Sequence, residues 1–150
     1  MKTRILWLAA LVSFGAHASE PATAPAAPAA TPAPASAISL PLISQDALLA
    51  RQAKHDAALV VLDVRTPEEF AQGHVPGAVN IPHDQVASRL ADIPRDKDVV
   101  LYCRSGRRAG LAAEVLGANG YKRLSHLEGD MIAWTEKGRP VESQAAPAQH

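Results

Sequence analysis

Short apolar runs alternate with longer amphipathic stretches between about residue 38 and residue 141. The run 57–62 is apolar at every position, as expected of a central strand that is buried on both faces of a parallel sheet. The run 99–102 has the same character and leads directly into the only cysteine of the chain. On this pattern we predict short strands at 38–40, 57–62, 78–81, 99–102 and 122–125.

The stretches between these strands carry helix signals. Ser44 can cap a helix over residues 45–54, and residues 66–69 (Thr-Pro-Glu-Glu) combine an N-cap, a first-turn proline and acidic side chains. Gly73 should end that second helix early. Further helices are predicted at 82–91, from the cysteine loop to residue 119, and at 130–137. Strands that alternate with helices predict an α/β domain whose parallel sheet is covered by helices on both faces.

Both ends of the chain differ from this region. Residues 1–18 combine a basic start, an apolar run at 5–14 and an Ala-x-Ala pattern, which predict a secretory signal peptide cleaved after Ala18. A mitochondrial transit peptide is the alternative interpretation, although such peptides are amphipathic rather than continuously apolar. Residues 19–37 are almost entirely Ala and Pro and predict an extended linker. The domain is therefore expected at 38–141, followed by a flexible tail at 142–150.

The charge balance limits the classes of partner. The chain has 15 Lys and Arg against 15 Asp and Glu, and cleavage of the signal peptide removes Lys2 and Arg4. This balance gives no support for binding to nucleic acid or to an anionic membrane surface. The run at 5–14 is shorter than the roughly 20 residues of a membrane span, so no stable membrane anchor is expected after cleavage. We expect small-molecule partners, a periplasmic location and, by default, a monomer.

The residues around Cys103 predict a site for a sulfur anion. Cysteine reacts as the thiolate, which is stabilised by the N-terminus of a helix and by nearby positive charge. Arg104, Arg107 and Arg108 lie within five residues of the thiol, and Gly106 allows a turn tight enough for backbone N–H groups to converge. A buried structural cysteine is the alternative, but the polar and charged neighbours argue against it. Such a loop could hold a thiolate or the larger anion of a persulfide.

Five sequence blocks resemble, in order, the signature blocks of the single-domain rhodaneses, the thiosulfate sulfurtransferase family. They lie at residues 62–65, 67–70, 73–82, 102–108 and 127–134. The resemblance implies a single rhodanese-like α/β domain with a five-stranded parallel sheet. It also implies that Cys103 is the nucleophile. The rest of its six-residue loop is Arg104, Ser105, Gly106, Arg107 and Arg108.

The resemblance implies a double displacement. Cys103 would take a sulfane sulfur from thiosulfate or a similar donor, hold it as a persulfide, and pass it to a thiophilic acceptor such as cyanide. No cofactor is implied beyond this covalent intermediate. No metal is expected, because His83 and His126 are isolated and lack metal-ligand spacing. Asp63 and Arg65, at the end of a neighbouring strand, are expected to brace the loops as an ion pair rather than to take part in the chemistry.

Two positions depart from the family pattern, and two other functions remain open. Ala109 stands where similar domains usually carry Ser, and Asp130 stands where many carry a second Gly.

A cysteine-based phosphatase or arsenate reductase would need an arginine six residues after the cysteine, which is the position of Ala109. A non-catalytic rhodanese-like sulfur carrier or binding module is the other alternative. Retention of Cys103 in a polar, glycine-containing loop favours catalysis.

Overall fold

The computed structural model of the chain describes residues 39–144. The predicted signal peptide at 1–18 and the predicted linker at 19–37 lie outside the described residues, as does most of the predicted tail at 142–150. None of the helices within residues 39–144 combines the length and the apolar character of a membrane span.

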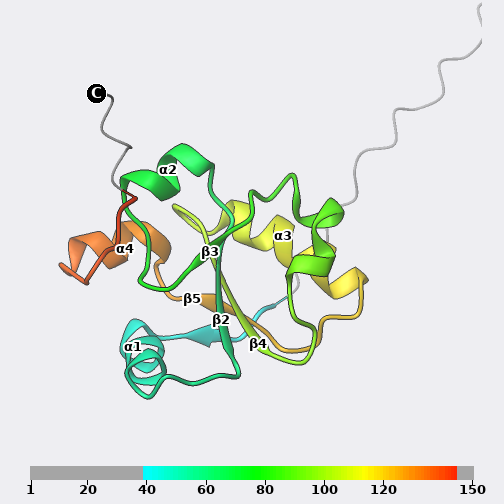
Figure 1. Cartoon of the computed structure of the whole chain (residues 1–150), viewed down its shortest axis with the longest axis horizontal. Coiled ribbons are helices and arrows are strands. Elements are labelled where there is room, and N and C mark those ends of the chain that lie inside the picture. Colours follow the sequence, from blue (N-terminus) through cyan, green and yellow to red (C-terminus); the bar gives the residue numbers. More distant parts are fainter. Residues whose placement is uncertain (1–38, 145–150) are drawn as a thin grey trace, which may run out of the picture. The chain divides into compact units, whose positions relative to one another are not determined.

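One parallel sheet forms the centre of the described domain (Figure 1). Its strand order is β1-β5-β4-β2-β3, and all four neighbouring pairs are parallel. The strands are β1 (Leu42–Ile43), β2 (Leu59–Asp63), β3 (Val79–Asn80), β4 (Asp98–Tyr102) and β5 (Leu124–Leu127). The predicted α/β class and five-stranded parallel sheet are confirmed.

Helices cover both faces of this sheet, as predicted. They are α1 (Gln45–Ala53), α2 (Pro67–Gln72), α3 (Arg107–Ala118) and α4 (Asp130–Glu136). One core packs the sheet against α3, with Leu101 and Leu116 fully buried, and the other packs it against α1 and α4, with Leu48 and Trp134 fully buried. Side chains alternate between the two cores along β4, because successive residues of a strand point to opposite faces. Cys103 therefore belongs to the α3 core and Tyr102 to the α1 and α4 core.

Two predicted helix starts are present with their caps. The Ser44 hydroxyl accepts a hydrogen bond from the N–H of Ala47 at 3.2 Å and begins α1. Thr66 and Glu69 form a capping box at the start of α2, in which each side chain accepts from the backbone N–H of the other residue. This box fixes the position of Glu69, whose carboxylate reaches the cysteine loop.

Three predicted elements need correction. The first strand is Leu42–Ile43 rather than 38–40, and the last is Leu124–Leu127 rather than 122–125. Segment 82–91 is not an α-helix but contains two 3₁₀ helices, Val86–Ser88 and Leu90–Asp92. Tyr121, which is buried before β5, donates its hydroxyl to the carbonyls of Leu90 and Ile93 and so ties the end of this segment to the start of the last strand. The tertiary contact thus competes with the local preference for an α-helix over 82–91.

The carboxyl-terminal end of the domain pairs with the turn that follows α2. The backbones of His74 and Glu142 exchange two hydrogen bonds, at 2.8 and 2.9 Å, in an antiparallel bridge. The Glu142 carboxylate also accepts from the N–H of Gly77 at 3.0 Å. Glu142 lies one residue beyond the predicted domain boundary and is nevertheless part of the packed structure. The His74 ring bonds the carbonyl of Phe70, in keeping with a role in bracing the turn.

Candidate active site

Cys103 follows β4 immediately and opens the turn that leads into α3. Its side chain belongs to the buried α3 core, and the residue is only 1% exposed. Gly106 adopts a φ of 98°, a left-handed conformation that favours glycine, and it directs its N–H toward the Cys103 Sγ at 3.0 Å. A backbone N–H at the start of a helix therefore points at the sulfur, where it would stabilise negative charge.

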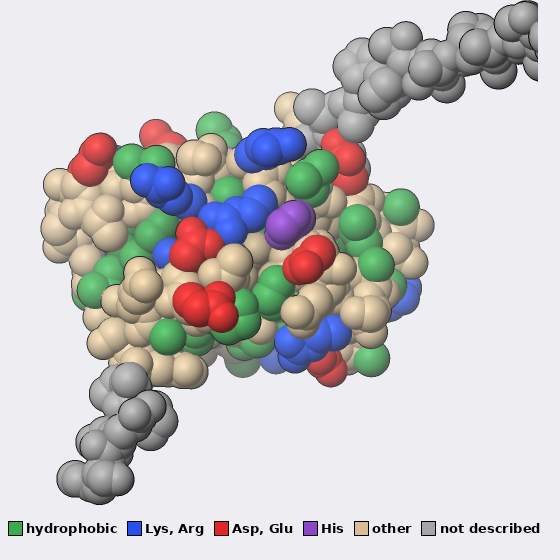
Figure 2. Space-filling model, turned by 90° about the horizontal axis from the view of Figure 1, so that it is seen from above, with side chains coloured by type: hydrophobic (Ala, Val, Ile, Leu, Met, Phe, Trp, Pro, Cys, Tyr) green, Lys and Arg blue, Asp and Glu red, His purple; other side chains and the backbone are tan. Residues whose placement is uncertain are grey.

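The three arginines of the loop differ in their surroundings. Arg104 and Arg107 are exposed, and neither forms an ion pair with another residue in the range 39–144. Arg108 is half-buried and is bound by both carboxylate oxygens of Glu69, at 2.6 and 2.9 Å. The loop thus presents two free guanidinium groups to solvent and ties the third to α2. Figure 2 views this end of the domain from above and shows basic, acidic and histidine side chains mingled at its centre.

The ion pair between Glu69 and Arg108 shifts the pKa of both groups. The hydrogen bond to Arg108 is the main reason why the pKa of Glu69 falls from 4.5 to about 2. The hydrogen bond that Arg108 donates to Glu69 raises the pKa of Arg108, and the charge of a Cys103 thiolate adds a smaller contribution. The positive charge of Arg108 is therefore held permanently beside the sulfur by a carboxylate that remains ionised.

Asp63 and Arg65 form a buried ion pair at the carboxyl end of β2. Asp63 is fully buried and Arg65 is 5% exposed, with a shortest guanidinium–carboxylate distance of 2.7 Å. Burial opposes the charge of Arg65, but the hydrogen bond with Asp63 raises the pKa of this arginine. The Tyr102 hydroxyl also donates to Asp63, at 2.6 Å, and burial together with the Asp63 charge raises the pKa of that hydroxyl. Arg65 further donates to the carbonyl of Gly73 at 2.7 Å, so the pair joins β2, β4 and the turn after α2.

Asp130 contacts the cysteine loop directly, a role that the sequence did not predict. Its Oδ1 accepts a hydrogen bond from the backbone N–H of Cys103 at 2.8 Å, and its Oδ2 lies 2.9 Å from the Nε2 of His126. The N–H groups of Met131 and Ile132 donate to the carbonyls of Cys103 and Arg104. His126 is therefore not isolated, in contrast to the expectation from sequence. Its spacing of four residues from Asp130 was the only available signal.

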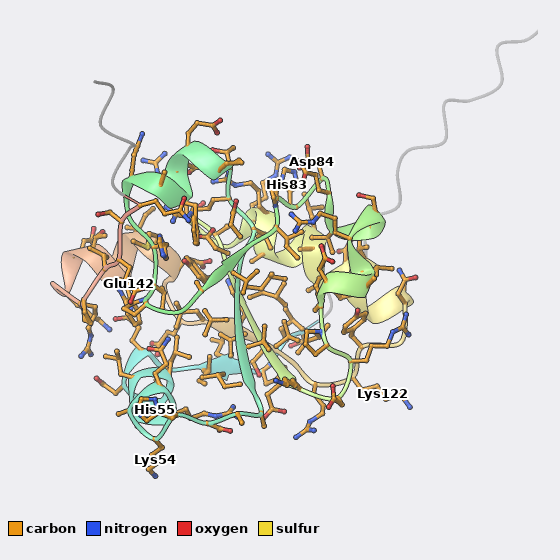
Figure 3. The ribbon with its side chains drawn as sticks, in the orientation of Figure 1. Lys54, His55, His83, Asp84, Lys122 and Glu142 are labelled. Carbon is orange, nitrogen blue, oxygen red and sulfur yellow. The ribbon has the colours of Figure 1, made fainter. Side chains whose placement is uncertain are left out.

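His83, the other histidine considered in the sequence, does not lie beside Cys103 and Asp130. His83 and Asp84 follow β3 and lie at the same end of the domain as α2, whereas Lys54 and His55 lie at the opposite end (Figure 3). Among residues 39–144 no group of three or more His, Cys, Asp or Glu side chains is arranged to hold a metal ion.

An open pocket adjoins the loop between α2 and α4. Its volume is about 430 Å³, within the range of small-molecule sites. Arg104 lines it on the side of the loop, Glu69 and Glu136 contribute acidic side chains, and Met131 and Ile132 contribute apolar surface. Cys103 itself is not part of the wall. Arg104 therefore connects the loop with this cavity.

Comparison with known proteins identifies the family of the domain. Residues 44–137 match the family model described as the rhodanese-like domain. The chain belongs to the rhodanese family. The matched region contains β2 to β5, the cysteine loop and α4, so the signature blocks in the sequence are confirmed as those of a rhodanese-like domain.

Relatives of this rhodanese-like domain are named for sulfur transfer. A sulfurtransferase of Allochromatium vinosum is 42% identical over 99 residues, which cover 66% of this chain and 92% of the relative. The thiosulfate:glutathione sulfurtransferase of Saccharomyces cerevisiae is 33% identical over 98 residues, covering 57% of this chain and 70% of the relative. A solved structure, a rhodanese-related protein of Thermoplasma volcanium, matches with a TM-score of 0.60 and 30% identity over 68% of this chain and 97% of that protein. Other relatives are longer, and the chain spans 47% and 54% of two of them. Sulfur transfer is thus supported as the general activity.

The position six residues after the cysteine is occupied by a core residue. Ala109 is fully buried in α3 and packs in the same core as Cys103. This rhodanese-like domain therefore lacks, at that position, the arginine that a cysteine-based phosphatase would need.

The ion pair between Glu69 and Arg108 should give the rhodanese-like domain a measurable sensitivity to acid. A carboxylate whose pKa is lowered on folding stabilises the native state above its unfolded pKa. The stabilisation is lost as the pH falls through the folded pKa. Here the loss is expected between pH 4.5 and about 2. We expect Glu69→Gln to lower the free energy of unfolding at pH 7 by about 1 kcal/mol or less, because the pair is partly exposed.

Urea denaturation at several pH values would check this. The difference between wild type and Glu69→Gln should shrink as the pH falls from 4.5 toward 2. Glu68→Gln is the matched control, since Glu68 is the exposed neighbour in the same helical turn. A difference that stayed constant down to pH 2 would show that Glu69 does not act through its charge.

Proposed function

We propose that this chain is a sulfurtransferase that accepts a sulfane sulfur from thiosulfate and carries it as a Cys103 persulfide. The observation that carries the proposal is the position of the sulfur. Sγ lies inside the turn that begins α3 and receives the Gly106 N–H at 3.0 Å, with two exposed arginines in the same loop. Backbone N–H groups at a helix start stabilise an anion without the need for a mobile counterion.

The proposed reaction has two displacements. The Cys103 thiolate attacks the outer sulfur of thiosulfate and forms a new S–S bond, while the original S–S bond breaks and its electron pair leaves with sulfite. The acceptor then attacks the outer sulfur of the persulfide, and the electron pair of the broken bond returns to Cys103 as thiolate. With cyanide the product is thiocyanate, and no external oxidant or reductant is consumed. Covalent catalysis of this kind predicts ping-pong kinetics.

The chain's own residues support each step in a different way. Arg104 and Arg107 are exposed and unpaired within the described range, so their charges can attract a dianionic donor. Arg108 is fixed by Glu69, so it supplies a constant positive charge beside the sulfur. The Gly106 N–H can stay directed at the Cys103 sulfur when the thiolate becomes a persulfide, because β4 and α3 fix this turn from both sides.

Small thiols are proposed as acceptors beside cyanide. The pocket next to Arg104 combines two basic, two acidic and several apolar side chains, which suits a small molecule with both charged and apolar parts. The yeast relative is named for transfer to glutathione, a thiol of this kind. The acceptor would reach the persulfide from the side of Arg104.

A donor and acceptor screen tests the proposal. Incubation with thiosulfate should add one sulfur atom to the protein by mass spectrometry. Because the chain has one cysteine, iodoacetamide should block the addition completely. Initial rates with thiosulfate and cyanide, and then with glutathione, should give parallel double-reciprocal plots. Polysulfide and mercaptopyruvate serve as alternative donors.

If no donor adds sulfur, the chain is a binding module. If sulfur is added but no small acceptor removes it, the chain is a carrier. Activity toward a generic aryl phosphate would support the phosphatase instead.

A further inference from the structure

A buried carboxylate lies directly behind the nucleophile. Asp130 is 3% exposed and begins α4 with a φ of 52°, a left-handed conformation that Asp tolerates better than most residues. Its Oδ1 accepts the backbone N–H of Cys103 at 2.8 Å. That N–H is therefore committed to a carboxylate and is not available to the sulfur of the same residue.

His126 shares this buried space from β5. Its Nε2 lies 2.9 Å from the Oδ2 of Asp130, but the ring is not aligned for a hydrogen bond, and no residue in the described range gives Nε2 another partner. The side chains of Asp130 and His126 both lie close to Gly106 in the loop. A Cβ built on this glycine would lie 3.1 Å from the Oδ2 of Asp130 and 3.1 Å from the Cε1 of His126. Gly106 also donates its N–H to the Cys103 Sγ, so the pair is one residue away from the reacting atom.

The charges of these groups act on the sulfur in opposite directions. A carboxylate near the loop disfavours a second anion at Cys103, whereas a protonated imidazole beside that carboxylate compensates its charge. The other charged groups that face the loop are fixed. Arg108 is paired with Glu69 from α2, and β1, which pairs with β5 at His126, contributes only Leu42 there. The net charge of the pair behind the loop therefore depends on whether the His126 imidazole carries one proton or two.

We propose that Asp130 and His126 are a positioning pair that sets how readily Cys103 becomes an anion. Asp130 holds the backbone of Cys103 and restrains the negative charge of its sulfur, and protonated His126 relieves this restraint. The inference rests on the proposed function only in the sense that both displacement steps pass through a sulfur anion at Cys103. It adds two residues, from β5 and α4, to a site that the loop alone would otherwise define.

Asp130→Asn separates the charge from the hydrogen bond. The amide oxygen can still accept the Cys103 N–H, and Asn tolerates the left-handed backbone, so only the negative charge is removed. We expect iodoacetamide to alkylate Cys103 in this variant about fivefold faster than in wild type at pH 7, a scale set by one nearby charge inside a protein. The rising limb of its pH–rate profile should move to lower pH. A merely structural role would leave the profile in place.

His126→Gln tests the other partner. At pH 6 we expect alkylation to be slower than in wild type by about threefold, because glutamine cannot carry the positive charge of a protonated imidazole. In the double variant with Asp130→Asn the His126→Gln effect should disappear, because two residues that act as a unit are not additive.

Glu128→Gln is the control for these variants, and several outcomes would contradict the proposal. Glu128→Gln removes an exposed charge two residues before Asp130 and should leave the alkylation rate within about 1.5-fold of wild type, because exposed charges are screened. Unchanged or slower alkylation in Asp130→Asn would overturn the proposal, as would full additivity in the double variant.

If Asp130→Asn does not fold, Asp130→Gly replaces it, since glycine accepts the same φ, and faster alkylation is again expected. Alkylation needs no sulfur donor, so it can reject the pair while persulfide formation is intact. Conversely, a wild type that forms no persulfide would reject only the proposed function.

Discussion

Replacing Cys103 by serine is expected to abolish sulfur transfer, by at least about a thousandfold, as for removal of other covalent nucleophiles. A hydroxyl is not ionised near neutral pH, and the Gly106 N–H that would favour a thiolate cannot change this enough. Serine also cannot form the S–S bond that carries the transferred atom. The initial rate of thiocyanate formation from thiosulfate and cyanide measures the effect directly.

The same variant should keep the fold, which makes the loss interpretable. Ser Oγ can still accept the Gly106 N–H that Sγ accepts now, so the buried position is not left with an unpaired polar group. Circular dichroism and a melting curve would verify this. Wild type blocked with iodoacetamide is the matched control, because the chain contains no second thiol. If Cys103→Ser retained more than a few per cent of the rate, or still gained a sulfur from thiosulfate, the persulfide mechanism would be wrong.

Local signals in the sequence were sufficient to predict the position of the nucleophile. The apolar run before Cys103, the glycine in the turn and the helical stretch after it all lie between residues 99 and 119. A strand, a turn and a helix follow from such signals because each depends on neighbouring residues. The arginines show the limit of this approach. By sequence the three are equivalent, but the structure pairs Arg108 with Glu69, 39 residues away, and leaves Arg104 and Arg107 exposed.

The contacts behind the loop could not be predicted for the same reason. Asp130 is 27 residues from Cys103, and its contact depends on β4 and β5 being neighbours in the sheet. The sequence indicated only a departure from the family pattern and an acidic residue at a helix start. The prediction of an α-helix at 82–91 was wrong for a related reason. The local pattern there favours an α-helix, but the segment forms two 3₁₀ helices, and the carbonyl of Leu90 accepts a hydrogen bond from the hydroxyl of Tyr121, 31 residues away.

Replacing Asp63 by alanine should be the most destabilising single change among the charged residues of the domain. Asp63 is fully buried and accepts hydrogen bonds from Arg65 and from the Tyr102 hydroxyl. Its loss leaves a buried guanidinium without a counterion, which typically costs about 3–5 kcal/mol. Single domains have roughly 5–15 kcal/mol of stability in total, so much of the protein should be unfolded at moderate urea concentrations. The midpoint of urea denaturation at pH 7 measures the loss.

The cause of this loss can be tested by removing the second charge as well. If the cost comes from the uncompensated guanidinium, then Arg65→Met in the Asp63→Ala background should restore part of the stability. An unpaired buried charge is worse than no charge at all. If the cost comes from lost hydrogen bonds, the double variant should be at least as unstable as Asp63→Ala. Asp92→Ala is the matched control, because Asp92 is paired with Arg89 at the surface and its loss should change stability by less than about 1 kcal/mol. A double variant that recovers stability without recovering activity would show that the Asp63–Arg65 pair shapes the loops around Cys103 as well as holding the strands together.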